Sequence, residues 1–315
     1  MEIETTPADE PQELVRCYVC DSDAFELVKV AEDRLFAQPG KYRIVRCTAC
    51  GLQLVNPRPT LAALGRHYPD EYFIYQKPED SAAFLRPLLA KLVHDQWKHY
   101  IERFERVRGK FTPETRVLDV GCGLNDHLAM LQELRGCVGL GVDFKPEIAA
   151  YVRETRGMPV HAGTLQSAGL APASFDVITM NEYLEHEPMP RDVLAEARRV
   201  IKPGGHLAIE IPHIDGFAAK LFGARWSQVD VPRHLVYFNA KTLAELLKRT
   251  GFRLIHTETS KIPGLIGVSV MQALGARRLG KMSTLDITLS ALAGAPLLPL
   301  YPWLDEFMFA VAVAE

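Results

Sequence analysis

Four of the six cysteines form two short pairs near the amino end of the chain. Cys17 and Cys20 make one Cys-x-x-Cys pair, and Cys47 and Cys50 make a second pair after 26 intervening residues. Each such turn directs two thiolates at one ion, and two turns close a tetrahedral site that leaves no position for water. The spacing therefore predicts a structural Zn²⁺ site in a small zinc-ribbon-like module, which we place at residues 11–60.

A glycine turn and an acid form the second chemical pattern. An apolar run of strand length, residues 117–120, is followed by Gly121 and Gly123, where the absence of side chains lets a ligand lie against the backbone. A second apolar run ends at Asp143, 22 residues after Gly121, where a carboxylate can accept the hydroxyls of a ribose. Asp143 can also cap the helix expected from Pro146, and the two roles are compatible.

Four motifs in the middle of the chain occur in the order of one known family: VLDVGCG, GVD, AGTLQSAGLAPASFDVITMNEYLEH and ARRVIKPGGHLAIEIP. Residues 116–252, which carry them, resemble a class I S-adenosylmethionine-dependent methyltransferase. The amino-terminal CYVC, YRIVRCTACGLQLVNPRPT and HYPDEYF resemble the zinc-binding head of a subset of these enzymes. The resemblance implies an α/β, Rossmann-like core with a mostly parallel seven-stranded sheet and an antiparallel last strand. It also implies S-adenosylmethionine as the cofactor.

The resemblance assigns roles around that cofactor. The glycine turn and Asp119 would hold its methionine end, Asp143 the ribose and Thr164 with Leu165 the adenine edge, while Asn181 would lie beside the sulfonium. The chain departs from the family where many members have a third glycine, here Asn125, and where many have Asp, here Thr164. The full set of expected cofactor residues is Asp119, Gly121, Cys122, Gly123, Asp143, Phe144, Thr164, Leu165 and Asn181.

Methyl transfer to a hydroxyl requires a base, and histidine suits that task at neutral pH. His234 is the preferred base because it follows a loop that can close over substrate, and His186 and Tyr237 are the other catalytic candidates. Each histidine also has a structural alternative: helix entry and packing for His186, a structural hydrogen bond for His234. His213 is a further residue expected to line the pocket.

The residues before His234 bear on the type of reaction. Zinc-headed deoxysugar C-methyltransferases, which this segment resembles, show Tyr and Glu just before the histidine, whereas this chain has Val231, Pro232 and Arg233. The difference favours O-methylation over carbon methylation. We expect Arg233 to pair with a phosphate or carboxylate on the acceptor.

The elements that must position these residues alternate from Arg116 onward. Apolar runs of strand length alternate with segments of helical period, which predicts a parallel sheet covered by helices on both faces. A helix, or a turn and a helix, is expected over Val236–Thr250, and another helix over Phe84–Val107, whose Arg103, Arg106 and Arg108 we interpret as a solvated helix end. The expected strands are Val117–Val120, Val138–Val142, Val177–Met180, Leu207–Ile211, Phe252–Thr257 and Phe307–Ala314.

The chain is expected to comprise three parts. The zinc-ribbon-like module at 11–60 is followed by a helical linker at 61–110 that covers the pocket, and by the cofactor-binding domain at 111–315. That domain is predicted to carry a lid at about 213–240 and an apolar insertion at about 261–305. Prolines interrupt Leu285–Trp303 within this insertion, so we predict a pocket cap or a surface-lying element there, not a membrane span.

Charge and composition limit the partners. The net charge of -3 disfavours nucleic acid as a partner. The first dozen residues are acidic and lack an apolar leader, which disfavours a secretory signal and predicts a cytoplasmic protein. The acceptor is expected to be a small molecule, a glycan or a lipid-linked molecule, with peripheral membrane contact left open and the oligomeric state not readable. The alternatives are an RNA methyltransferase that uses the zinc head to bind substrate, a deoxysugar C-methyltransferase, or a non-catalytic cofactor-binding scaffold.

Overall fold

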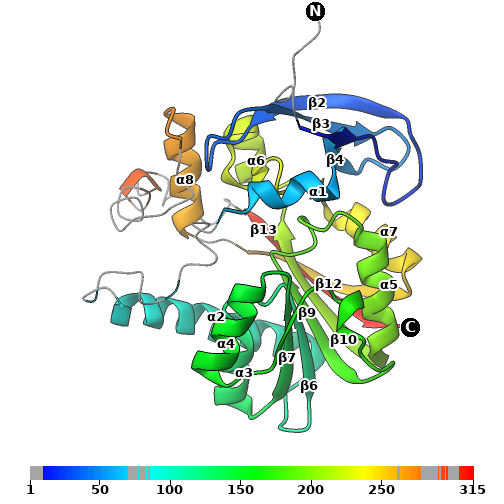
Figure 1. Ribbon diagram of the computed structural model, residues 1–315, viewed down its shortest axis with the longest axis vertical. Helices are drawn as coiled ribbons and strands as arrows, with labels where there is room; N and C mark the ends of the chain where they lie inside the picture. The colour runs from blue at the N-terminus through cyan, green and yellow to red at the C-terminus, as the bar shows by residue number, and fades with distance from the viewer. Residues whose placement is uncertain are drawn as a thin grey trace, which may run out of the picture.

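The computed structural model is built around a seven-stranded sheet in the order β12-β13-β10-β9-β6-β7-β8 (Figure 1). It describes residues 10–69, 77, 83, 86–260, 263–277, 290, 292–294, 296 and 305–315, with backbone alone for 88, 89, 263 and 264. The strands are β6 (Arg116–Val120), β7 (Val138–Asp143), β8 (Val160–Ala162), β9 (Phe175–Asn181), β10 (Ile201–Pro212), β12 (Phe252–Ser260) and β13 (Phe307–Ala314). Strands β6 to β10 pair in parallel, and β13 is antiparallel to both of its neighbours. The predicted fold class is confirmed, and every expected strand lies within an observed one.

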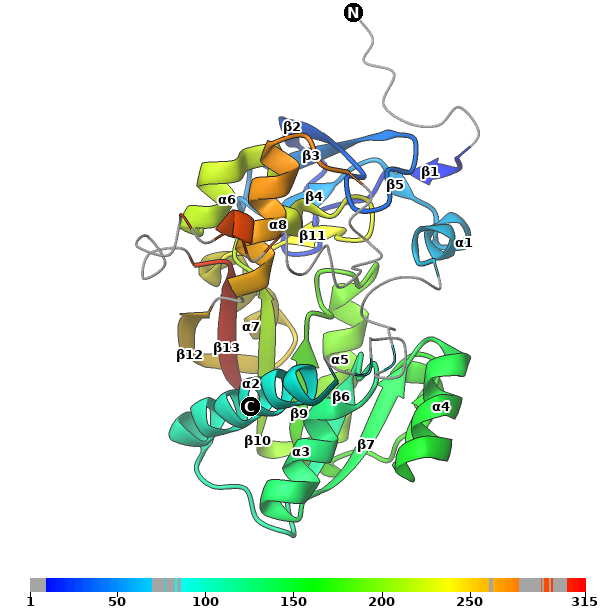
Figure 2. The ribbon, with the colours of Figure 1, turned by 90° about the vertical axis from the view of Figure 1, so that its left-hand side faces the viewer.

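Helices cover both faces of the sheet because successive strand residues point to opposite sides. Leu118 and Val120 pack into a core with α5 (Pro190–Val200) and α7 (Ala240–Arg249). Val117 instead belongs to the core on the other face. The helices of that second face are α2 (Arg86–Arg108), α3 (Asp126–Arg135) and α4 (Pro146–Arg156), and Figure 2 shows α2 and α3 in front of the strands.

The amino-terminal cysteines lie at two turns beside a four-stranded sheet of order β11-β4-β3-β2, which lies above the main sheet (Figure 1). Strands β2 (Phe25–Glu32), β3 (Lys41–Cys47) and β4 (Gln53–Val55) are contributed by the head, and β1 (Gln12–Glu13) pairs separately with β5 (Arg58–Pro59). The edge strand β11 (Val236–Tyr237) comes from the other end of the chain. The helix predicted from Val236 therefore begins only at Ala240, because the first two residues pair with β4.

Helix α6 (Phe217–Phe222) packs against the head sheet through Ala218 and Ala219 and contacts α8 (Pro263–Ala273), while the short helix α1 (Leu61–Leu64) contacts β5. Trp226 and Val229, from the expected lid, are buried with Ala31 and Tyr42 of the head. Most of the expected 261–305 insertion, including nearly all of Leu285–Trp303, lies outside the described residues. Among the helices that the structure describes, none has the length and apolar character to cross a membrane.

Candidate functional site

The glycine turn follows β6 directly and is fixed by β7. Gly121 and Gly123 adopt φ values of +75° and +49°, which favour glycine. The backbone amides of Gly121 and Cys122 donate to the carbonyl of Val142, at 2.8 and 3.1 Å. No atom lies within 4 Å of the place where a Cβ on Gly123 would stand, so the turn is open there.

Asp143 points at this turn from the end of β7. Its Oδ2 accepts a hydrogen bond from the Gly123 amide at 2.9 Å, and its Oδ1 accepts one from the Lys145 amide at 3.0 Å. Burial raises the pKa of Asp143 above its ordinary value, and the two amides act in the opposite direction. Each carboxylate oxygen has a further lone pair, so the group can still accept a hydroxyl.

Tyr183 covers the other half of the turn. A Cβ on Gly121 would come within 2.5 Å of Tyr183 Cδ2, so the bare glycine makes room for this ring. The Tyr183 hydroxyl donates to Glu187 at 2.7 Å, which fixes the ring's position. The sequence analysis did not single out Tyr183, because the motif does not show which side chain lies over the glycine.

The other expected cofactor residues differ in how accessible they are. Asn181, at the end of β9, has both amide atoms buried and without a well-formed hydrogen bond to any described residue. Asp119 is buried and accepts a hydrogen bond from Thr179 at 2.6 Å. Leu165 lies in the core, whereas Thr164 is exposed and makes hydrogen bonds with Ser167. Half-exposed Phe144 contacts the ring of Tyr68.

His186 and His234 come together although 48 positions separate them in the sequence. Their rings meet edge to face with centroids 4.5 Å apart. Nδ1 of His186 lies 3.1 Å from the Arg233 carbonyl, and Nδ1 of His234 lies 2.8 Å from the Gln228 carbonyl. Burial lowers the pKa of His186 to about 3 and also lowers that of His234, so both rings are neutral at pH 7.

Glu185 completes this cluster, and the sequence analysis missed it. Its carboxylate is fully buried, and neither oxygen makes a well-formed hydrogen bond to another described residue. Burial is the main cause that raises its pKa to about 8, with further upward contributions from Asp230 and Glu210. The signal was its place beside His186 in Glu-His-Glu, but sequence alone does not show that both oxygens lack partners.

Arg233 has a structural role, and the expectation that it pairs with an acceptor is wrong. Its side chain is 0% exposed and forms ion pairs with Asp33 at 2.8 Å and Asp230 at 2.5 Å. One guanidinium nitrogen also donates to the carbonyl of His67. The guanidinium is therefore surrounded by protein acceptors and offers no exposed face to a ligand.

Two other expected residues also have protein partners. The buried Tyr237 hydroxyl donates to the Val229 carbonyl at 2.6 Å, within the head interface. Nδ1 of His213 lies 3.2 Å from a carboxylate oxygen of Asp305, which precedes the last strand, β13. The structure thus brings His186 and His234 together, whereas Tyr237 and His213 make their hydrogen-bond contacts with other residues, Val229 and Asp305.

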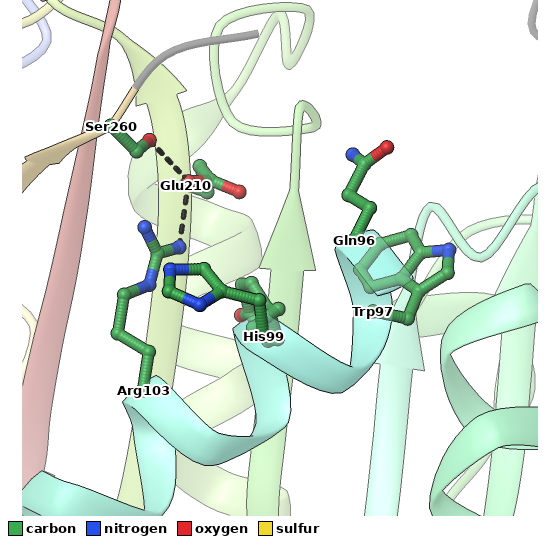
Figure 3. Close-up of a pocket in the computed structure, with 7 residues that line it drawn as sticks. Gln96, Trp97, His99, Arg103, Glu210 and Ser260 are labelled. Atoms are coloured by element: carbon green, nitrogen blue, oxygen red, sulfur yellow. Dashed lines mark hydrogen bonds and ion pairs between the residues drawn. The ribbon is translucent and has the colours of Figure 1, made fainter. Parts of the chain in front are cut away.

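A cleft of about 380 Å³ lies between α2 and the carboxyl ends of β10 and β12 (Figure 3). Arg103 pairs there with Glu210 at 2.7 Å, and Ser260 donates to the same carboxylate at 2.5 Å. The interpretation of Arg103 as part of a solvated helix end is wrong, because its side chain is buried. Glu210 pairs in register with Asn181, the last residue of β9. The cleft therefore lies at the carboxyl edge of the sheet, where the glycine turn also lies. Its lining is Gln96, Trp97, His99, Tyr100, Arg103, Glu210 and Ser260.

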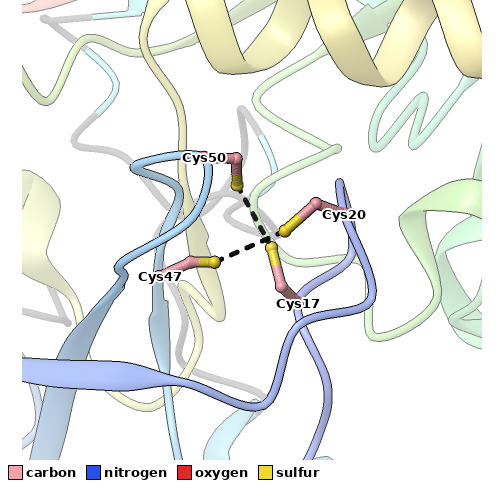
Figure 4. Close-up of side chains that lie close together, drawn as sticks. All are labelled: Cys17, Cys20, Cys47 and Cys50. Carbon is pink, nitrogen blue, oxygen red and sulfur yellow. Dashed lines mark hydrogen bonds between the residues drawn. The ribbon is translucent and has the colours of Figure 1, made fainter.

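The four cysteines converge in the head, as Figure 4 shows. Sγ atoms of Cys17 and Cys50 are 3.4 Å apart, as are those of Cys20 and Cys47. A tetrahedral ion with Zn–S bonds of about 2.3 Å needs sulfur separations of about 3.8 Å, which small side-chain shifts supply. Burial raises the pKa of Cys17 and raises that of Cys50 to about 11, whereas backbone amides lower the pKa of Cys47 to about 7 although burial opposes them. A metal ion bound among the four sulfur atoms would favour the thiolate form of each. The cluster is compatible with zinc.

Comparison with known proteins adds evidence from sequence. A family model described as a methyltransferase domain matches residues 89–257. An uncharacterized protein of Methanocaldococcus jannaschii is 28% identical over 159 residues, which are 50% of this chain and 73% of that protein. A ubiquinone biosynthesis O-methyltransferase of Pseudomonas putida is 38% identical over 98 residues, which are 29% of this chain and 42% of that protein. The chain therefore spans less than half the length of this second relative.

Solved structures agree on the fold. The geranyl diphosphate C-methyltransferase of Streptomyces coelicolor superimposes with a TM-score of 0.52, covering 77% of this chain and 88% of that one. Because the two are only 13% identical, the likeness concerns the fold alone.

The buried Arg233 ion pairs lead to a prediction about stability. Arg233→Met leaves Asp33 and Asp230 buried without their cation, so we expect the free energy of unfolding to fall by about 3–5 kcal/mol. Denaturant titration followed by circular dichroism measures the change. The matched control is Arg253→Met, which removes an exposed pair with Glu315 and is expected to cost less than about 1 kcal/mol. Equal losses in the two variants would contradict the structural role.

Proposed function

We propose, since this chain belongs to the methyltransferase-domain family, that it transfers a methyl group to a hydroxyl of a small-molecule, glycan or lipid-linked acceptor. The coarser statement, an S-adenosylmethionine-dependent methyltransferase, follows from the family and the fold. The observation that carries the finer proposal is the pair of neutral histidines beside the carboxyl end of β9. O-methylation is further supported by the partial relatives, which are ubiquinone biosynthesis O-methyltransferases.

The residues at the glycine turn fit an adenosyl cofactor. Gly123 leaves open space, Asp143 presents carboxylate oxygens to it, and the amide atoms of Asn181 make no well-formed hydrogen bond to a described residue. When bound, S-adenosylmethionine supplies a methyl carbon activated by a positive sulfur. We assign the ribose hydroxyls to Asp143 and the methionine end to Asn181 and the turn. The cleft beside Glu210 is proposed to admit the acceptor.

His234 is the proposed base. Because a carbonyl oxygen only accepts hydrogen bonds, the contact with Gln228 requires a proton on Nδ1 and leaves a lone pair on Nε2 of the neutral ring. Nε2 can then take the proton from the acceptor hydroxyl. That oxygen forms its new bond to the methyl carbon while the carbon–sulfur bond breaks, and the electron pair stays on sulfur. Burial of His234 excludes water from this step.

The remaining parts of the chain complete the proposal. The head at 11–60 holds a structural Zn²⁺ through its four cysteines, and the linker at 61–110 covers the cleft. The domain at 111–315 binds the cofactor, with the lid at about 213–240 closing the acceptor side, and the insertion expected at about 261–305 lies mostly outside the described residues. Trp226 and Val229, buried beneath the head, support a lid that is anchored by the zinc-containing sheet.

Cofactor binding is tested by calorimetric titration of S-adenosylmethionine. Asp143→Asn weakens a charged hydrogen bond to the ribose, so we expect about 10- to 100-fold weaker binding than in the unmodified protein. The matched control is Asp176→Asn, a carboxylate that also accepts from a backbone amide but lies at the amino end of β9. Absence of binding in the unmodified protein would sink the cofactor assignment, and unchanged binding in Asp143→Asn would sink the role of Asp143.

The base is tested by replacing His234 with asparagine. We expect transfer of labelled methyl to acceptors in an extract of the source organism to fall at least about 100-fold, because no group takes the proton. The cofactor affinity should stay within about twofold. His206→Asn, nearer the amino end of β10, is the control and should keep its turnover. Full turnover by the His234 variant refutes the proposed base.

The metal in the head is tested by elemental analysis. Cys47→Ser removes one thiolate, so we expect the zinc content to fall from about one ion per chain to near zero and the melting temperature to drop. Cys137→Ser, a buried cysteine outside the cluster, should keep its zinc. A zinc content that is equal in the two variants would exclude the four-cysteine site.

A further inference from the structure

Glu185, His186 and His234 form a second group with the composition of a metal site, separate from the four cysteines. One ligand atom from each of the three residues lies within 4.8 Å of those of the other two. Glu185 and His186 follow β9, whereas His234 precedes β11, and the main chain ties these segments together. The Leu235 amide donates to the Glu185 carbonyl at 2.8 Å. Backbone hydrogen bonding therefore fixes the two segments that carry the three side chains relative to each other.

The hydrogen bonds of both histidines leave one lone pair each for a ligand. Nδ1 of His234 faces the Gln228 carbonyl, so it carries the proton. Nδ1 of His186 lies 3.1 Å from both the Arg233 carbonyl and the Tyr68 hydroxyl. A proton on this Nδ1 satisfies the carbonyl, and the Tyr68 hydroxyl, which can accept as well as donate, is compatible with it. Neither Nε2 atom has a hydrogen-bond partner among the described residues. The carboxylate oxygen nearest to Nε2 of His234 belongs to Asp230 and is 4.0 Å away. Metal-binding histidines characteristically donate their other ring N–H to a carbonyl or carboxylate in this way.

Glu185 is the independent observation that points to a ligand. Its side chain is only 1% exposed, yet neither carboxylate oxygen is hydrogen-bonded to another described residue. A buried carboxylate without a partner is costly, and a bound cation removes that cost. The buried guanidinium of Arg233 pairs with Asp33 and Asp230.

We propose that Glu185, His186 and His234 bind one divalent transition-metal ion. Two imidazoles and one carboxylate suit Fe²⁺, Mn²⁺, Co²⁺ or Zn²⁺ and leave coordination positions open, whereas Mg²⁺ and Ca²⁺ prefer oxygen ligands. The site itself does not depend on methyl transfer. Its use rests on the proposed function: an acceptor hydroxyl would occupy an open position, where the ion would lower its pKa so that solvent water takes the proton before the methyl group is transferred. His234 then acts as a ligand, and in the metal-free protein it is the base.

The test uses the full chain with its cysteine site already loaded with zinc. The protein is dialysed against Co²⁺, and bound metal is measured by elemental analysis together with the visible spectrum. We expect about one Co²⁺ per chain beyond the zinc, without the thiolate absorption that exchange into the cysteine site would produce. Glu185→Gln and His234→Asn should each weaken Co²⁺ binding at least about tenfold, since each loses a ligand. His94→Asn, which alters a surface histidine beside Asp95, should bind as the unmodified protein does.

The outcomes separate this proposal from the proposed function. No Co²⁺ beyond the zinc, or uptake by both Glu185→Gln and His234→Asn equal to that of the unmodified protein, overturns the metal site. Cofactor titration on the same samples reports whether each variant is folded and binds S-adenosylmethionine. Methyl transfer without bound Co²⁺ would leave the transferase standing and exclude a requirement for the ion. Co²⁺ uptake without cofactor binding would support the site and refute the transferase.

Discussion

The buried guanidinium of Arg233 is the interaction on which the candidate site depends. It joins Asp33 of the amino-terminal sheet to Asp230 of the segment that leads to His234, and the carbonyl of Arg233 itself faces His186. One residue thus links the four-cysteine head to both histidines. A buried ion pair of this kind contributes little to the net free energy of unfolding, but removing one partner is costly. Its main effect is therefore to fix the positions of the segments that carry the charged residues. The histidine geometry is in this sense a property of the head as much as of the main sheet.

The other half of the site depends on the sheet. Parallel strands bring the turn after β6, Asp143 after β7 and Asn181 after β9 to one edge. Open α/β sheets bind ligands at that edge. The ring of Tyr183 covers Gly121, so the open part of the turn lies around Gly123 and Asp143. The cleft beside Glu210 lies on β10, the strand next to β9. The arrangement separates the polar turn around Gly123 and Asp143 from the cleft beside Glu210.

Much of this was predictable because buried parallel strands carry apolar runs and end at residues with special chemistry. Val117–Val120 and Val177–Met180 were found on that basis, and the paired cysteines were found from spacing alone. What failed depended on distant partners. Arg233 meets Asp33 across 200 residues, Arg103 meets Glu210 across 107, and neither pairing leaves a local pattern. Val236 was assigned to a helix because its apolar neighbours fit that period, whereas pairing with β4 decided its conformation. Glu185 escaped notice because the absence of a partner is visible only in three dimensions.

The strand β11 has a consequence for how the chain acquires its shape during synthesis. Val236 pairs with Leu54, so β4 leaves the ribosome roughly 180 residues before the strand that completes its sheet. Five strands of the main sheet, β6 to β10, are translated in that interval. The edge of β4 therefore stays unpaired until β11 has been synthesised, and such long-range pairing is slow to form. Because an unpaired strand edge can pair with another chain, the synthesis of β11 ends a period in which the nascent head is prone to aggregation.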